Sequence, residues 1–127
     1  MAVIWYVDDD EDHLNKYSQD LEELGHEVRK FTSGRCMLSE LETVRPDLVI
    51  LDIRMPDMDG FEVLGKVLAN DNTIPVIFHT AYASYENNYL VWSAEAYAIK
   101  QVSKGGEPSE LVKVVEGSLA KQGRKGS

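Results

Sequence analysis

The sequence predicts an α/β fold: a doubly wound parallel sheet of five strands with helices on both faces. Three observations predict it. Five short apolar runs recur along the chain, helical patterns separate them, and the runs are nearly all apolar instead of alternating with polar residues. Strands of that kind are buried on both faces, as in parallel sheets covered by crossover helices. A chain of 127 residues has room for one such domain.

The predicted strands are short and rich in β-branched residues, which favour extended backbone. Their boundaries follow the apolar runs Val3–Val7, Val28–Phe31, Leu48–Leu51, Ile74–Phe78 and Tyr97–Ile99.

The predicted helices carry apolar residues three or four positions apart, which places those residues on one face. We expect Gly25 to end the first helix, Pro46 to stop the second and Pro108 to begin the last. The apolar stripes run over Leu14–Leu24, Leu38–Val44, Phe61–Leu68, about Ser84–Glu95, and Leu111–Leu119. We expect the domain to cover residues 1–120 and residues 121–127 to form a flexible tail or linker stub.

Composition excludes several classes of function. The chain has 13 Lys and Arg against 22 Asp and Glu, for a net charge of -9, so it should repel nucleic acid and anionic membranes. One cysteine, Cys36, allows no internal disulfide, and no Cys/His cluster has zinc spacing. No apolar run is long enough to span a membrane, and no secretion signal is visible. We therefore expect a cytoplasmic protein.

Charged or hydroxyl side chains stand at the ends of four of the predicted strands. Asp8 and Asp9 follow the first, Asp52 follows the third, Thr80 ends the fourth and Lys100 follows the fifth. In an open parallel sheet, ligands bind beyond the carboxyl ends of the strands, where the strand order changes direction. These side chains should therefore meet at one edge of the sheet.

Three carboxylates at one edge need positive charge. Two like charges about 4 Å apart repel by about 4 kcal/mol at an effective dielectric constant near 20. Lys100 supplies one positive charge, and a hard divalent ion such as Mg²⁺ suits a site with few carboxylates and a phosphate. Singly, each residue has a simpler explanation; Asp10 to Asp12 should merely cap a helix. Jointly, the four strand ends favour a magnesium site.

The loop from Ile53 to Gly60 contains a proline and ends in Asp-Gly, so it should form a tight turn. Such a loop can direct the backbone carbonyl of Arg54 at the metal, whereas Asp57 and Asp59 fit turn and cap positions. His79 should point away from Thr80 across the strand, and His13 and His26 fit surface positions. We assign no catalytic role to these histidines.

The ordered set of motifs resembles the receiver domain of two-component response regulators over Ala2 to Ala120. The segments that carry the resemblance are Val7-Asp8-Asp9-Asp10-Glu11, Pro46 to Gly60 with Asp52 inside it, Ile74-Pro75-Val76-Ile77 leading to Thr80-Ala81, and Ala96-Tyr97-Ala98-Ile99-Lys100. The resemblance implies a flavodoxin-like fold with strand order 2-1-3-4-5, and a phosphorylation switch rather than an enzyme acting on other molecules.

The resemblance also implies a role for each site residue. Asp52 would accept a phosphoryl group from a phosphohistidine of a sensor histidine kinase or phosphotransfer protein. Mg²⁺ would be bound by Asp9 directly, by Asp8 through water, by Asp52 and by the Arg54 carbonyl. Lys100 and Thr80 would contact the phosphoryl oxygens. A carboxylate attacking phosphorus needs alignment and charge neutralisation rather than a general base, which agrees with this set.

Signalling would follow from the contacts that phosphorylation adds. Thr80 would move towards the phosphoryl group and Tyr97, at the aromatic switch position, would turn inward. The face made by the fourth helix, the fifth strand and the fifth helix would then change. That face carries Tyr85, Tyr89 and Trp92 and would bind an output domain, a partner or a second copy. Arg54 and Tyr82 would flank the hydrolytic water and slow self-dephosphorylation.

Two alternatives remain open. Gln101 follows Lys100 where the family usually has proline, so the chain could be a receiver-shaped interaction module that takes no phosphate. Alternatively, Asp8-Asp9-Asp10 offers the Asp-x-Asp of a magnesium-dependent phosphohydrolase of the haloacid dehalogenase type, whose nucleophile would be Asp8. The chain is too short for the usual cap domain of that class.

Overall fold

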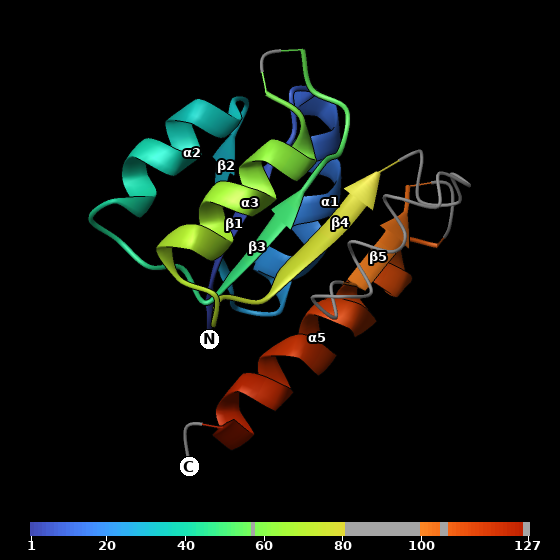
Figure 1. The fold of residues 1–127 in the computed structure, drawn as a ribbon. Helices are drawn as coiled ribbons and strands as arrows, with labels where there is room; N and C mark the ends of the chain where they lie inside the picture. The colour runs from blue at the N-terminus through green and yellow to red at the C-terminus, as the bar shows by residue number, and fades with distance from the viewer. Residues whose placement is uncertain (57, 81–99, 105–106, 126–127) are drawn as a thin grey trace.

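A computed structural model of the chain describes residues 1–56, 58–80, 100–104 and 107–125. Strands and helices alternate along it (Figure 1). In chain order they are β1 (Val3–Val7), α1 (Glu11–Glu23), β2 (Glu27–Phe31), α2 (Gly34–Leu41), β3 (Leu48–Leu51), α3 (Gly60–Asn70), β4 (Val76–Thr80), β5 (Lys100–Ser103) and α5 (Pro108–Lys125).

The strands form one parallel sheet of five in the order β2-β1-β3-β4-β5. This confirms both the predicted fold class and the order implied by the resemblance. The chain runs from β1 outward to β2 and then back past β1 to β3. The strand order therefore changes direction between β1 and β3, which is where a doubly wound sheet binds its ligand.

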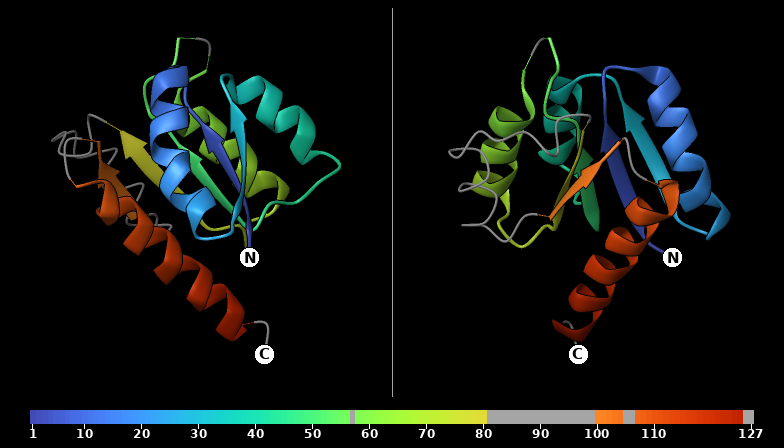
Figure 2. Two further views of the ribbon diagram at one scale, coloured as in Figure 1. Left: turned by 180° about the vertical axis from the view of Figure 1, so that it is seen from behind. Right: turned by 90° about the vertical axis from the view of Figure 1, so that its right-hand side faces the viewer.

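Two apolar layers enclose the sheet because successive strand residues point to opposite faces. Trp5, Val7 and Phe78 belong to the layer beneath α2 and α3, whereas Ile4, Tyr6 and Ile77 belong to the layer beneath α1 and α5. Figure 2 shows the two helix pairs on opposite sides of the sheet. Burial from both sides explains why the sequence of each central strand is apolar throughout.

Short polar side chains cap α1, α2 and α3. The Asp10 carboxylate accepts hydrogen bonds from the backbone N–H groups of Asp12 and His13, and the Asp59 carboxylate caps α3 in the same way. Ser33 caps α2. Gly25 has a φ of 95° just after α1, a conformation that L side chains rarely adopt, which confirms it as the end of that helix.

The boundaries of several elements differ from the prediction: β2 begins one residue earlier, at Glu27, and β4 lies two residues later, over Val76–Thr80. Helix α2 ends at Leu41, before Val44, and α5 continues to Lys125, past the expected start of the tail. Strand β5 occupies Lys100–Ser103; the predicted strand Tyr97–Ile99 and the predicted helix Ser84–Glu95 lie outside the described residues. Only Val102 of β5 is buried, so this edge strand has little of the apolar signal that marked the others.

No helix among the described residues is long and apolar enough to cross a membrane.

Candidate functional site: a carboxylate cluster with a buried lysine

The turns after β1 and β3 bring three aspartates together. Val7 and Leu51, the last residues of the two strands, are partners in the parallel register, so Asp8 and Asp52 leave the sheet side by side. The Asp52 backbone N–H donates to the Val7 carbonyl over 3.0 Å. Carboxylate oxygens of Asp8, Asp9 and Asp52 all lie within 4.8 Å of one another, as predicted for a metal-binding cluster.

These carboxylates differ in exposure. Asp8 is fully buried and Asp52 is 6% exposed, whereas Asp9 is open to solvent. One Asp8 oxygen accepts a hydrogen bond from the Asp10 backbone N–H over 2.9 Å. Burial of ionised carboxylates is costly unless positive charge or hydrogen bonds compensate for the lost hydration. The site therefore requires a cation at close range.

Lys104 provides that cation. Its Nζ donates to Asp8 Oδ2 over 2.5 Å and lies 3.5 Å from Asp52 Oδ2, and its side chain is 9% exposed. Lys104 follows Ser103, which pairs with Thr80 at the ends of β5 and β4. The ammonium group thus reaches the aspartates from the carboxyl edge of the sheet.

Lys100 does not lie at this edge, which corrects the prediction. It is the first residue of β5, is exposed, and pairs in register with Ile77 near the start of β4. A strand rises about 3.3 Å per residue, so Lys100 stands about 13 Å along the strand from Lys104. The predicted strand ended one lysine too early. Loop length could have identified the correct one, since residues 105–107 alone separate Lys104 from Pro108, and short strand-to-helix loops are the norm.

The other predicted site residues are placed less fully. Thr80 is the last residue of β4, at the correct edge, but its side chain is outside the described part of the structure. Arg54 lies in the loop after Asp52 with an exposed side chain, and the predicted role of its carbonyl stays a prediction. Tyr97 and Tyr82 fall outside the described residues.

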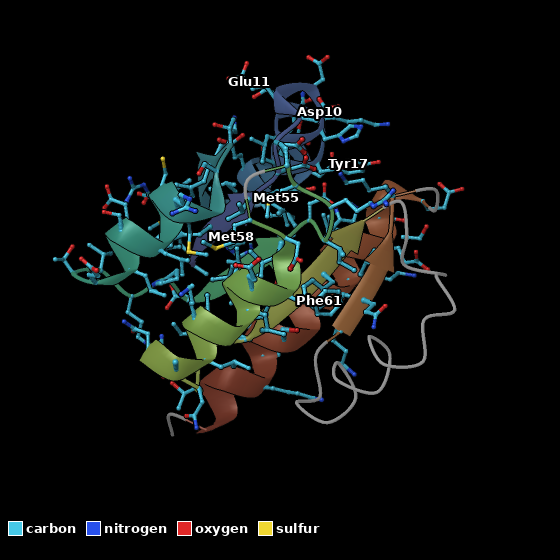
Figure 3. All side chains as sticks on the ribbon, turned by 45° about the horizontal axis from the view of Figure 1, so that its top comes forward. Asp10, Glu11, Tyr17, Met55, Met58 and Phe61 are labelled. Atoms are coloured by element: carbon cyan, nitrogen blue, oxygen red, sulfur yellow. The ribbon has the colours of Figure 1, made fainter. Side chains whose placement is uncertain are left out.

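Gly60 fixes the backbone next to Asp52. Its N–H donates to the Ile53 carbonyl over 2.7 Å, closing the loop onto the strand end. A Cβ at this position would lie 2.4 Å from the Asp52 carbonyl oxygen, closer than any side chain allows. The Asp-Gly pair of the loop therefore has two functions: Asp59 caps α3, and Gly60 permits the close approach of that helix to Asp52. Figure 3 views this edge, with Met55 and Met58 of the loop labelled.

Helix α1 contributes residues that sequence reasoning missed. His13, expected at the surface, places Nδ1 3.0 Å from Lys104 Nζ and 3.7 Å from Asp8 Oδ2. The Tyr17 hydroxyl donates to the Lys104 carbonyl over 3.0 Å. The i, i+4 spacing of these two residues put them on one helix face, but nothing in the sequence indicated that the face meets Lys104.

His79 is buried between Tyr6 and Tyr17, and the prediction that it points away from Thr80 stays a prediction because the Thr80 side chain is outside the described part of the structure. Its Nδ1 lies 2.5 Å from the Tyr6 hydroxyl, and its ring meets the Tyr17 ring edge to face at 4.4 Å. Burial, with the nearby Lys104 charge, lowers the pKa of His79 to about 4. Burial and then the negative charge of Asp8 raise the pKa of the Tyr6 hydroxyl. Both groups are neutral at pH 7.

The donor set fits a hard divalent cation. It consists of carboxylate oxygens, with the exposed Asp9 giving access from solvent, and oxygen ligands of this kind suit Mg²⁺. Three carboxylates within 4.8 Å of one another repel, and among the described residues the Lys104 ammonium contributes one positive charge to them, so a further cation is favoured.

Comparison with known proteins gives one consistent family. Residues 4–116 match the response regulator receiver domain. The chain is 34% identical over 118 residues to the regulatory protein AtoC of Escherichia coli, covering 92% of this chain and 25% of AtoC. It is 36% identical to an uncharacterised 14.6 kDa protein of Leptolyngbya boryana, covering 89% of this chain and 86% of that protein. The chain thus spans a quarter of one relative and most of the other.

Solved structures agree with the sequence match. A CheY-like receiver domain protein from Methanospirillum hungatei has a TM-score of 0.87 and 32% identity, with 98% of each chain covered. The response regulator TrrA from Thermotoga maritima, solved in complex with Mg²⁺-BeF, has a TM-score of 0.81 and 30% identity, with 93% of this chain and 99% of that chain covered. This chain therefore belongs to the response regulator receiver domain family.

Proposed function

We propose that the chain is a phosphoacceptor switch in which Asp52 takes a phosphoryl group from a phosphohistidine of a sensor kinase or phosphotransfer protein. The observation that carries the proposal is the buried contact of Lys104 with both Asp8 and Asp52 beside the exposed Asp9. The Lys104 ammonium group places a positive charge beside Asp52, where a phosphoryl group would add negative charge.

In the chemical step the phosphoryl group moves from a histidine nitrogen to a carboxylate oxygen. A carboxylate oxygen of Asp52 forms a P–O bond while the P–N bond of the phosphohistidine breaks. The electron pair of that bond leaves with the imidazole nitrogen, which takes up a proton from solvent. No general base is needed, because the attacking carboxylate is already ionised. This agrees with a site that presents charge and hydrogen-bond donors to Asp52.

Asp8, Asp9 and Asp52 are the side chains that would hold Mg²⁺, together with the carbonyl of Arg54. When bound, Mg²⁺ supplies positive charge that offsets the repulsion between the acceptor and the incoming phosphoryl oxygens. Mg²⁺ is present with a beryllofluoride group in the related TrrA structure, which supports the same ion for this chain.

Lys104, in place of Lys100, is proposed to contact a phosphoryl oxygen. The ammonium already lies 3.5 Å from Asp52 Oδ2, so a group attached to that carboxylate would come within its reach. Thr80, at the end of the neighbouring strand, is proposed as a second hydrogen-bond donor. A charge-assisted hydrogen bond contributes about 1.5–3 kcal/mol. Two or three such contacts are enough to reverse an equilibrium between two conformations of the domain.

The correction of the lysine changes the proposed switch position. Tyr97, the switch position that the resemblance implies, lies three residues before Lys100, and the residue at the same spacing before Lys104 is Gln101. Gln101 is half-buried in the middle of β5, next to β4. We therefore place the switch at Gln101, with the exposed face of β5 and α5 as the surface that an output domain, a partner or a second copy would bind. Arg54 and Tyr82 remain proposed modulators of phosphoryl lifetime.

Intact mass spectrometry after incubation with acetyl phosphate and Mg²⁺ tests the proposal. We expect one phosphoryl adduct in the wild-type chain and none in Asp52→Asn. Asp59→Asn is the matched control, because asparagine caps a helix about as well as aspartate and the residue lies in the same loop. Absence of an adduct in the wild type, or an adduct that survives in Asp52→Asn, would contradict the proposal. Turnover of a phosphoester that depends on Asp8 would instead support a phosphohydrolase.

A further inference from the structure

Lys104 follows the last residue of β5, and its side chain extends from there to Asp8 and Asp52. A lysine side chain has several freely rotating bonds, and ordering it costs up to about 2 kcal/mol of conformational entropy. Yet the side chain is 9% exposed and its Nζ contacts two carboxylates. Other elements must fix it.

His13 of α1 fixes the ammonium end. An ammonium group has three N–H donors and no acceptor, so His13 Nδ1, 3.0 Å away, can only accept. The other ring nitrogen, Nε2, lies 3.6 Å from Asp10 Oδ2. Asp8 Oδ2, His13 Nδ1 and Asp52 Oδ2 thus offer one acceptor for each donor of Lys104. His13 completes the set from helix α1.

Tyr17 fixes the backbone end. Its hydroxyl, one helical turn after His13, donates to the Lys104 carbonyl over 3.0 Å. The Tyr17 ring is buried and held edge to face against His79, with ring centroids 4.4 Å apart and planes at 89°. The hydroxyl is therefore presented from a rigid position in the core. One face of α1 contacts both ends of the same lysine.

We propose that His13 and Tyr17 are positioning residues that hold Lys104 in line with Asp52. The inference rests on the proposed function, since alignment of the lysine matters only if Asp52 accepts a phosphoryl group. In this arrangement α1, the helix that follows Asp8 and Asp9, also determines the position of the Lys104 ammonium group. Loss of either contact should leave the fold and the aspartates in place but let the ammonium group move.

The first measurement follows Lys104 directly, without phosphorylation. The ¹H–¹⁵N signal of its side-chain ammonium, recorded by NMR at low temperature, should show restricted motion and slow hydrogen exchange in the wild type. His13→Leu should broaden or remove the signal, and His13→Gln, whose amide oxygen can accept from Nζ, should restore it. Tyr17→Phe should increase the motion of Lys104. Gln19→Ala, on an exposed position of α1, is the control and should change nothing.

The second measurement is the rate of phosphorylation by acetyl phosphate at saturating Mg²⁺. We expect His13→Leu and Tyr17→Phe to lower the maximum rate about 3- to 10-fold, the equivalent of one hydrogen bond, with Mg²⁺ affinity unchanged. His13→Gln should remain within about twofold of the wild type, a rescue that a purely structural role would not give.

The outcomes separate the two proposals. An ammonium signal that is equally ordered in the wild type, His13→Leu and Tyr17→Phe would overturn the positioning role, as would equal rates in His13→Leu and His13→Gln. If the wild-type chain takes no phosphoryl group, the proposed function fails, and the NMR comparison alone then decides whether α1 positions Lys104.

Discussion

The two faces of the sheet support the site in different ways. Beneath α2 and α3 the layer is apolar, and its one buried polar side-chain atom without a hydrogen-bond partner among the described residues is Trp5 Nε1. Beneath α1 and α5 the layer contains Tyr6, Tyr17 and His79, whose polar atoms are paired or contact the site. Packing alone shapes one face, whereas the other combines packing with directed hydrogen bonds.

This difference matches what each face must hold. The α3 side fixes the backbone of Asp52 through the close approach of Gly60, which is a steric constraint. The α1 side contacts Lys104 at both ends, the ammonium group through His13 and the backbone carbonyl through Tyr17, and these contacts are hydrogen bonds. A backbone can be located by contact, but a long flexible cation needs acceptors at defined distances.

The apolar face should show the largest effect on stability. Phe78 is fully buried there and its ring lies 4.9 Å from that of Phe61. Phe78→Ala should lower the free energy of unfolding by about 3–5 kcal/mol, because it leaves a cavity in a packed layer. Urea unfolding followed by circular dichroism measures it. A loss below about 1 kcal/mol would mean that this layer is not held by packing alone.

The contact between Gly60 and Asp52 gives the next largest effect. Gly60→Ala should lower the free energy of unfolding by about 3 kcal/mol, the upper end for overpacking, since the added Cβ meets backbone instead of a movable side chain. Gly65→Ala is the matched control in the same helix. Nothing lies within 4 Å of a Cβ there, so the substitution should stabilise the helix by about 0.5–1 kcal/mol. Equal changes in the free energy of unfolding would show that a Cβ at position 60 does not clash with the Asp52 backbone.

The polar face should make stability depend on pH. Because burial lowers the folded-state pKa of His79 to about 4, the unfolded chain binds more protons as the pH falls from neutrality towards that value. Stability should therefore fall with pH, by about 2 kcal/mol between pH 7 and pH 5 from this group.

The matched variant is His79→Gln, which retains a polar partner for Tyr6 but cannot titrate. Urea unfolding of both proteins at pH 7 and pH 5 measures the difference. If the two proteins lost the same amount of stability, His79 would not be the source of the acid sensitivity.

Much of the fold was predictable because the central strands are buried on both faces and their sequences are apolar throughout. The aspartate cluster was predictable for a related reason: Asp8 and Asp52 each follow such a strand, and the ends of parallel neighbours meet. The lysine was not. Strand β5 has one buried residue, Val102, so the apolar pattern does not mark the end of the strand and does not distinguish Lys104 from Lys100.

The contacts made by α1 could not be predicted either. His13 and Tyr17 occur in an ordinary amphipathic pattern, in which a histidine near the helix start is expected at the surface. Their contact with Lys104 joins segments 91 and 87 residues apart in the chain, and depends on how α1 packs over the sheet. Local sequence patterns contain no information about such a distance.

The most direct test of the account compares the two lysines. Lys104→Met and Lys100→Met each remove one positive charge from β5 or its end while keeping a side chain of similar length. With acetyl phosphate and Mg²⁺, and with folding checked by circular dichroism, the account predicts that Lys104→Met lowers the rate of adduct formation by about tenfold or more. Lys100→Met should stay within about twofold of the wild type, because an exposed charge so far from Asp52 is screened. The opposite order, or equal loss in both variants, would contradict the central role assigned to Lys104.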